Sequence, residues 1–533
     1  MTAERSTGSF RAAARDRGHR APRDDRFPFP TVDEVSRHCQ RDDDPENVHI
    51  EVHLPGRLDP ARLRAAFHEA LRRHPGILVR EAPGGWWRLR YVWERTGEPD
   101  VDPVRCAPPG PRALALARAR AVAHCPPLAV SPPVRLELVS PGPGETGSVL
   151  LLTINHTALD GPSCLRVLAT AAALYGAGRT AAHLPAPRPA APGPCAAHEP
   201  RAVSGPPSAP RTAPVPTPAP APAPASAPPP RTPRALPPAP SRRLTRPARV
   251  AADTRTPGAA GNGLFLADLP LPPRPAARSR STGAAGAVVP TVNDQLLVAT
   301  CLTIARWNRL HGRPPRPVRI TMPVDDRPRG AVELPIGNGT RLVEVGFGPG
   351  ERTDAALLSA ERPDPAAVAR LLEYTAARTR ALKAASGPQL GRAGALLTAP
   401  VLPVGLRAAV TRGLRRVAAP WTATTLLSNL GRLPDPLDFG DAGRATAVWL
   451  SAPTRPSRGV TFTCASTGGR LHLGLRWSRA VLDDAAGDEL AALFARSLAA
   501  TAAATTPPTP EPKPALPRRP RPPLQAPTAE EAS

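Results

Sequence analysis

A proline-rich segment near the middle of the chain separates two halves with different sequence character. From about residue 182 to residue 262 the sequence consists mainly of Pro, Ala, Ser and Arg, and Ala and Pro alternate between residues 214 and 230. Such a segment buries too little apolar surface to offset the entropy lost on ordering, so we predict an extended, disordered linker. The chain has 533 residues and 76 prolines, too many for one compact fold, so we expect the prolines to be localised.

The composition on either side of this linker sets the remaining boundaries. Residues 1–26 are charged and nearly free of large apolar side chains, and the residues after 500 are again rich in proline. We therefore predict two disordered tails and two globular lobes. The expected order is tail 1–26, lobe 27–181, linker 182–262, lobe 263–500 and tail 501–533.

The strong positive charge is weak evidence for any partner. The formal net charge is +25, but almost all of the cationic residues are arginine, with Lys383 and Lys513 the only lysines. Arg, Ala and Pro that rise together are typical of a genome composition bias. Since no basic patch is interleaved with aromatic residues and no nucleic-acid motif is found, we expect no specific nucleic-acid partner.

The cysteines and the N-terminal segment bear on the compartment. The seven cysteines are scattered, without Cys-x-x-Cys pairs or the spacing of zinc ligands, which favours buried thiols in a reducing compartment. Residues 1–26 lack the apolar core of a secretory signal, and no stretch approaches the length of a membrane-spanning helix. We therefore expect a cytoplasmic protein with no transmembrane segment and no metal site.

Hydrophobic periodicity predicts an α/β fold in both halves. Alternating apolar residues indicate a strand over 47–54, and Asp59 followed by Pro60 starts a helix that ends at His74. In the second half, Thr291 and Asp294 form a capping-box pattern at the start of a long helix. The other predicted strands are 77–80, 86–93, 134–139, 263–269, 318–322, 341–345, 425–430 and a hairpin over 460–475; the other predicted helices are 112–124, 365–385, 407–417 and 483–500.

One stretch of the first half has the form of a buried strand, a polar loop and a helix. An apolar run over 148–154 leads into Asn155-His156-Thr157-Ala158-Leu159-Asp160-Gly161, and Pro162 then begins a helical pattern that we expect to end near Tyr175. The strand would hold His156 at the mouth of the loop. A histidine in this position is a candidate general base.

Other interpretations of these residues remain open at this point. A single histidine at a strand end is more often structural than catalytic, and Asp160 near a helix start is a natural helix cap. A metal site would need a third ligand at a suitable spacing, and none accompanies His156 and Asp160. Ser163 is not in a nucleophile-elbow pattern, and Cys164 falls on the helix, where a core position is expected.

The loop sequence resembles the His-His-x-x-x-Asp-Gly signature of the CoA-dependent acyltransferase superfamily, with Asn155 in place of the first histidine. This superfamily includes condensation domains of nonribosomal peptide synthetases, polyketide-associated acyltransferases and wax ester synthases. Further segments are similar to the family and occur in the family's order: Leu71–Pro75, Thr291–Asp294, Pro323–Arg327, Gly337-Asn338 and Ser428–Gly431.

The resemblance implies both a fold and an activity. The expected fold is chloramphenicol acetyltransferase-like: two similar α/β lobes with mixed sheets and flanking helices, and an active site in a tunnel between them. The implied reaction moves an acyl group from a thioester of coenzyme A, or of the phosphopantetheine arm of an acyl or peptidyl carrier protein, to a hydroxyl or amine. These thioesters would be substrates, in specialised natural-product or lipid metabolism, and no bound cofactor is expected.

The resemblance also assigns roles to residues. His156 would be the catalytic base, and Asp160 would hold the loop by an ion pair with an arginine, for which we nominate Arg327. Gly161 would keep the channel clear for the thioester arm, and the Asn155 amide can still hydrogen-bond the loop. Two further residues that could line the tunnel are Ser428 and Asn429.

Two rival functions follow from features outside this mechanism. Asn155 and the long linker are compatible with a catalytically silent scaffold that docks an acyl carrier protein. The arginine content is compatible with a nucleic-acid binder, which would bind with a strong salt dependence. No adenylation domain and no carrier-protein serine motif is found, so an enzyme of this kind would be free-standing and receive its acyl group in trans.

Overall fold

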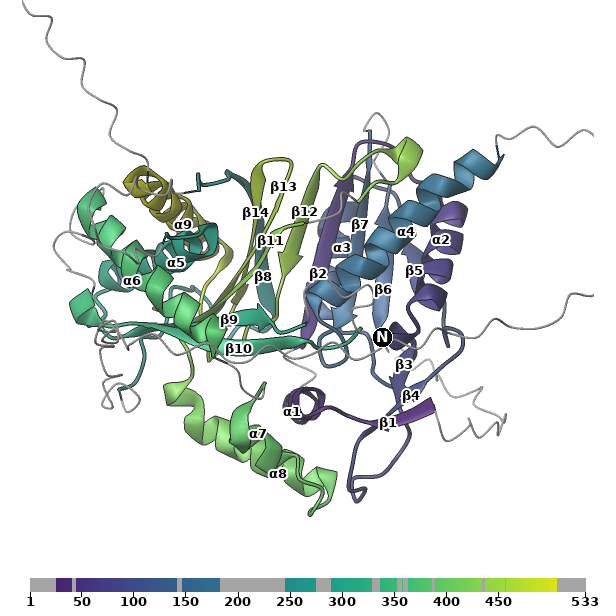
Figure 1. Ribbon diagram of the computed structural model, residues 1–533, viewed down its shortest axis with the longest axis horizontal. Coiled ribbons are helices and arrows are strands. Elements are labelled where there is room, and N and C mark those ends of the chain that lie inside the picture. The colour runs from purple at the N-terminus through teal and green to yellow at the C-terminus, as the bar shows by residue number, and fades with distance from the viewer. Residues whose placement is uncertain are drawn as a thin grey trace, which may run out of the picture.

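The computed structural model describes residues 25–40, 45–140, 146–182, 245–274, 289–327, 336–351, 357, 363–385, 389–433, 437–455 and 457–505. In this part of the chain the two large sheets stand side by side, each flanked by helices (Figure 1). Most of the predicted linker and nearly all of both predicted tails lie outside the described residues.

The first large sheet has, in the described residues, five strands in the order β12-β2-β7-β6-β5. Its central strands β2 (Asn47–Leu54), β7 (Ser148–Asn155) and β6 (Val134–Val139) are antiparallel, and β5 (Val104–Cys106) adds in parallel at one edge. The alternating apolar residues of β2 pack against helices α2 (Pro60–Arg73) and α4 (Gly161–Ala182). Helix α3 (Ala113–Ala123) packs on the opposite face against Leu151 of β7.

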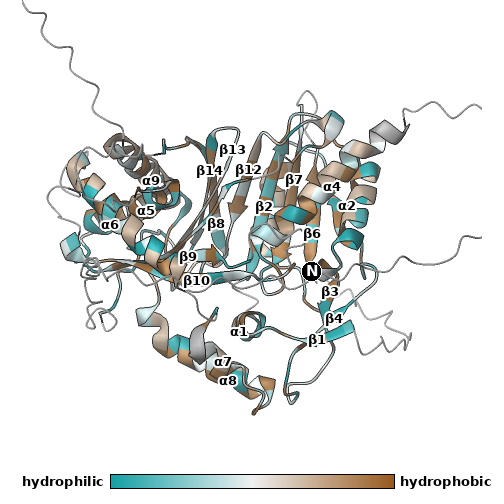
Figure 2. Cartoon of the chain, in the orientation of Figure 1, coloured by the Kyte–Doolittle hydropathy of each residue, from teal (hydrophilic) through white to brown (hydrophobic). Residues whose placement is uncertain are grey.

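The second large sheet has six described strands in the order β10-β9-β11-β13-β14-β8. Its apolar face is covered by α5 (Val292–Leu310), α6 (Pro365–Ala384) and α9 (Asp484–Thr505). In Figure 2 apolar residues gather along the strands, whereas polar residues are frequent on the outer helices. The strands are β8 (Asn262–Pro270), β9 (Val318–Asp325), β10 (Thr340–Phe347), β11 (Thr425–Arg432), β13 (Val460–Thr467) and β14 (Arg470–Ser478).

The local sequence patterns predicted most of these elements correctly. The Asp59 carboxylate accepts a hydrogen bond from the Arg62 N–H (2.6 Å), and the Asp294 carboxylate accepts from the N–H and hydroxyl of Thr291 (2.7 and 2.8 Å), so both predicted helix starts are confirmed. The predicted strand over 86–93 is wrong, because only β4 (Val92–Arg95) is extended, in a small sheet with β1 (Arg26–Pro28) and β3 (Val79–Glu81). Helices α1 (Thr31–Cys39) and α7 (Gly391–Leu397) were not predicted. Helix α8 (Val404–Ala418) was predicted over 407–417 and begins earlier.

The predicted boundaries of the linker and of the C-terminal tail need correction. Ala248, Val250 and Ala251 are buried in the core of the second sheet, and the Ala251 N–H donates to Asn308 Oδ1 on α5 (2.8 Å). Residues 245–262 therefore belong to the second lobe, where the apolar side chains between the prolines find a surface to cover. At the other end, α9 continues to Thr505, and α4 likewise runs past Tyr175.

The two halves of the sequence are not two independent lobes. Strand β12 (Ala447–Ser451) lies in the second half but pairs antiparallel with β2, so it completes the first sheet. It also packs on the second sheet, where the Thr463 hydroxyl donates to the Leu450 carbonyl and Trp449 Nε1 donates to the Ala267 carbonyl (3.1 Å). A single strand thus joins both sheets. The described residues include no helix that is long and apolar enough to cross a membrane.

Candidate functional site

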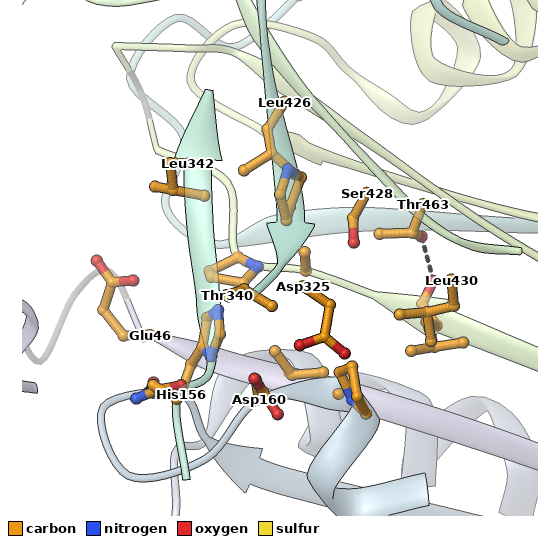
Figure 3. Close-up of a pocket in the computed structure, with 18 of the residues that line it drawn as sticks. Glu46, His156, Asp160, Asp325, Thr340, Leu342, Leu426, Ser428, Leu430 and Thr463 are labelled. Carbon is orange, nitrogen blue, oxygen red and sulfur yellow. Dashed lines mark hydrogen bonds between the residues drawn. The ribbon is translucent and has the colours of Figure 1, made fainter. Parts of the chain in front are cut away.

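A cavity of about 620 Å³ lies where the two sheets and helix α1 meet. Residues from both halves line it, including His156, Asp160 and Gly161 from the loop after β7, and Ser428 and Asn429 from β11. Much of the remaining wall is apolar, with Leu342 and Leu426 among its residues. The two halves of the chain thus form one shared chamber, which Figure 3 shows with His156 and Asp160 at one end.

His156 is held in one orientation by its own loop. Its backbone N–H donates to the Glu46 carbonyl (2.8 Å), and its Nδ1 lies 2.9 Å from the Leu159 carbonyl oxygen. A carbonyl oxygen only accepts, so Nδ1 must carry the proton, and in the neutral ring Nε2 holds the free lone pair. The half-buried imidazole lines the cavity and can therefore accept a proton from a molecule bound there.

The nominated ion pair between Asp160 and Arg327 is present. One Asp160 oxygen lies 2.7 Å from Arg327 Nη2 and accepts the Gly339 N–H (3.0 Å), and both side chains are about 95 % buried, with 3 % and 5 % exposed. The other oxygen accepts the N–H of Ser163 (3.1 Å), so the helix-cap interpretation of Asp160 is also correct. Arg327 further donates to Ser163 Oγ (3.0 Å) and the Gly337 carbonyl (2.7 Å). The pair fastens the loop of the first half to the segment after β9.

Asn338, which belongs to one of the segments similar to the family, provides a second link between the two halves of the chain. Its amide nitrogen donates to the carbonyls of His156 (3.2 Å) and Thr157 (2.9 Å) and to Asp33 Oδ1 (2.9 Å). Asp33 lies on α1 and also accepts from Trp93 Nε1 (3.0 Å). Burial raises the pKa of Asp33 to about 7, against the effect of these two hydrogen bonds, and the nearby Asp160 carboxylate adds to the rise. Nothing in the local pattern around Asp33 indicated this position.

Asn155 does not line the cavity. Its amide nitrogen donates to the Pro126 carbonyl (2.8 Å), and its oxygen accepts from the Thr157 N–H (3.1 Å) and from Gln40 Nε2 (3.0 Å). The side chain is buried and supports the loop from behind. The expectation that this amide hydrogen-bonds the loop is therefore confirmed.

Gly161 lines the cavity close to two leucine side chains. A Cβ at this position would be 3.3 Å from Leu450 Cδ2 and 3.9 Å from Leu430 Cδ1, and both leucines line the cavity. A larger side chain would therefore occupy cavity space. Ser428 and Asn429 line the same cavity, as the sequence suggested, and Asn429 Oδ1 also accepts the Gly431 N–H (2.9 Å).

The neighbouring nucleophile candidates have structural positions. Cys164 is fully buried, and burial raises the pKa of its thiol well above the usual range. The Ser163 hydroxyl donates to the Gly337 carbonyl (2.9 Å), which places it in the fastening between the halves. Among the described residues, no group of three His, Cys, Asp or Glu side chains is arranged to hold a metal ion.

The architecture recurs in solved structures. The condensation domain of the monacolin K polyketide synthase MokA superposes with a TM-score of 0.52 at 13% identity, covering 90% of this chain and 97% of that chain. The trichothecene 15-O-acetyltransferase TRI3 of Fusarium sporotrichioides gives 0.53 at 12% identity, covering 89% and 95%. The chain has a condensation-domain fold. A double mutant of the starter condensation domain of rhizomide synthetase RzmA, in complex with C8-CoA, shares it with a TM-score of 0.52 at 14% identity, covering 91% and 96%.

Sequence relatives extend the comparison without assigning an activity. An uncharacterized protein of Mycobacterium tuberculosis, present in strains H37Rv and CDC 1551, is 28% identical over 410 residues, which is 76% of this chain and 83% of the relative. CymA, a probable nonribosomal peptide synthetase of Salinispora arenicola, is 33% identical over 151 residues, which is 27% of this chain and 2% of the relative. No protein-family profile matches the chain. The solved structures thus confirm the expected fold.

Proposed function

We propose that the protein is an acyltransferase that moves an acyl group from a thioester, on coenzyme A or a carrier protein, to a hydroxyl or amine. The observation that carries this proposal is the His156 imidazole, which lines a largely apolar chamber with Nε2 as its free basic atom. The condensation-domain fold supports it, since TRI3 is named as an acetyltransferase and the RzmA domain was solved with C8-CoA.

The proposed reaction needs one proton acceptor at the point where the two substrates meet. His156 Nε2 takes the proton of the acceptor hydroxyl or amine as its oxygen or nitrogen attacks the thioester carbonyl carbon. The carbon–sulfur bond then breaks, and the imidazolium returns the proton to the departing thiolate. Positioned proton transfer of this kind contributes about 10²–10⁴-fold to a rate, and holding both substrates in one chamber adds to it.

Asp160 and Leu159 of the loop, and Asn338 from the second half of the chain, would act as positioning residues. Asp160 and Asn338 hold the loop backbone from two sides, and the Leu159 carbonyl fixes the imidazole tautomer. Because all three interactions exist before a substrate arrives, the base would need little reorganisation during the reaction. Asn155 supports the loop from behind, so its replacement of a histidine leaves the proposed base unaffected.

The test is acyl transfer from a panel of acyl-CoA and acyl-carrier donors to alcohol and amine acceptors, followed by mass spectrometry of the products. His156→Gln should lower product formation by at least about 100-fold while leaving the melting temperature unchanged. His124→Gln is the matched control, because His124 is exposed and remote in the sequence from the loop. Equal product levels for wild type and His156→Gln would refute the proposed base, and binding of donors without any product from the wild type would favour the silent scaffold.

A further inference from the structure

Two arginines, Arg415 and Arg458, line the same cavity and form no salt bridge with the described residues. Arg415 belongs to the last turns of α8, and Arg458 lies in the segment between β12 and β13. Each carboxylate that lines the cavity is already in an ion pair: Glu46 with Arg455, Asp160 with Arg327, and Asp325 with Arg327 (3.2 Å). Among the residues that the structure describes, neither Arg415 nor Arg458 has a side-chain hydrogen bond or salt bridge.

The surroundings of Arg458 destabilise its charged form. Its side chain is partly buried, and desolvation lowers the pKa of Arg458 to about 10, with repulsion from Arg415 as the next contribution. Glu344 acts in the opposite direction, but it is a surface residue of β10 and lies 3.5 Å from Arg319. Two cations that line one largely apolar chamber and form no salt bridge with the described residues are the arrangement expected of a site for an anionic ligand.

The strand register separates these arginines from His156. Glu344, Thr321, Leu426 and Thr461 lie in one row across the second sheet, and Thr340 and Asp325 lie in another row four residues along β10. Four residues of extended strand span roughly 13 Å. Arg458 precedes β13 on the side of the first row, whereas the Asp160 loop contacts Gly339 beside the second. In Figure 3 Leu342 and Leu426 lie at one end of the drawn wall and His156 lies at the other.

We propose that Arg415 and Arg458 form an anion-binding subsite that receives a carboxylate, or a similar oxyanion, carried by the acyl group or the acceptor whose reacting atom lies at His156. This inference rests on the proposed function, because it deepens the choice of substrate in the same cavity. The separation of the two ends selects for molecules with an apolar spacer between the reacting group and the anion. A planar guanidinium recognises a carboxylate through two parallel N–H donors, so it would set both distance and orientation.

The experiment measures binding, so that it does not depend on turnover. Full-length protein carrying His156→Gln is titrated by calorimetry with the mono-CoA thioester of decanedioic acid and with decanoyl-CoA, which differ only at the far end of the acyl chain. A second pair, 8-aminooctanoate and octylamine, tests the acceptor in the same way. Each titration is repeated with Arg458→Gln, with Arg415→Gln, and with the neighbouring surface control Arg416→Gln.

The expected result is that one ligand with the terminal carboxylate binds more tightly than its counterpart without it, and that Arg458→Gln or Arg415→Gln lowers that affinity about 10- to 100-fold. Arg416→Gln should leave the affinities unchanged, and neither cavity substitution should weaken binding of the ligands that lack the carboxylate. The responding pair identifies the substrate that carries the carboxylate. The proposal is overturned if neither pair responds to the substitutions. It is also overturned if binding of coenzyme A alone weakens equally, because the arginines would then contact the phosphates of the donor. A failed transfer assay alongside a preserved anion preference would instead refute only the proposed reaction.

Discussion

The two ends of the cavity differ in how their charged side chains are paired. At the His156 end, Asp160 and Arg327 meet at 2.7 Å, and further N–H and carbonyl groups use their remaining hydrogen-bonding capacity. At the other end, Arg415 and Arg458 line the same chamber without a hydrogen bond or salt bridge to the described residues, and the nearest carboxylate that acts on Arg458, Glu344, is exposed. A buried charge that is fully paired holds the protein together, whereas one left unpaired costs stability unless a ligand completes it. The contrast separates the residues that position the chemistry from those that recognise a substrate.

The largest effect on stability is expected when the ion pair between Asp160 and Arg327 is broken. Asp160→Ala and Arg327→Met each leave a buried charge without its partner, so each should lower the free energy of unfolding by about 3–5 kcal/mol. The double variant should lose clearly less than the sum, because it leaves no isolated charge. Urea unfolding of the four proteins measures the coupling, and strictly additive losses would show that the pair contributes nothing as a pair.

The effect next in size concerns Asp33, a buried carboxyl that accepts hydrogen bonds from Trp93 and Asn338 and has no salt bridge with the described residues. Its folded-state pKa of about 7 lies above the ordinary value, so the folded state binds the proton more tightly than the unfolded state. Its contribution to stability is thus fully present below about pH 4 and is lost as the pH rises towards 7, with a slope of up to about 1.4 kcal/mol per pH unit.

The Asp33→Asn variant isolates this contribution. Asparagine does not titrate, so the stability of the wild type relative to the variant should fall between about pH 4 and pH 7 and stay constant above. Thermal unfolding of both proteins over this range provides the measurement. Because the variant changes a hydrogen bond to Trp93 at every pH, the slope is informative and the offset is not. Parallel curves would mean that Asp33 keeps an ordinary pKa.

A smaller effect is expected at Asn155, behind the paired end. Asn155→Ala removes partners of the Pro126 carbonyl and the Thr157 N–H and should cost about 1–3 kcal/mol of stability. Asn155→His restores the residue of the family signature, yet it should not raise transfer activity, because this side chain does not reach the cavity. Melting temperatures and initial transfer rates test both statements. A gain in rate for Asn155→His would assign residue 155 a part in the chemistry.

The paired end was predictable from sequence, and the unpaired end was not. The loop from Asn155 to Gly161 is one continuous segment between a strand and a helix, so its local pattern carried the prediction of His156 and Asp160, and the family order supplied Arg327 as the partner. Arg415 and Arg458 are two of many arginines in a composition rich in them, and only tertiary packing shows that they line one chamber without a salt bridge to the described residues. Strand β12 escaped prediction for a related reason, since its pairing partner β2 is distant in the sequence.

The smallest effect on stability is expected at the unpaired end itself. Arg458→Gln removes a desolvated charge that has no salt bridge among the described residues, so the free energy of unfolding should change by less than about 1 kcal/mol or increase. This outcome, together with the loss of anion affinity, would establish that Arg458 is maintained for recognition and not for folding, because a residue needed for packing would fail in both measurements. Urea unfolding of Arg458→Gln beside Arg327→Met makes the comparison direct. A loss at Arg458 as large as that at Arg327 would mean that both ends of the cavity are structural.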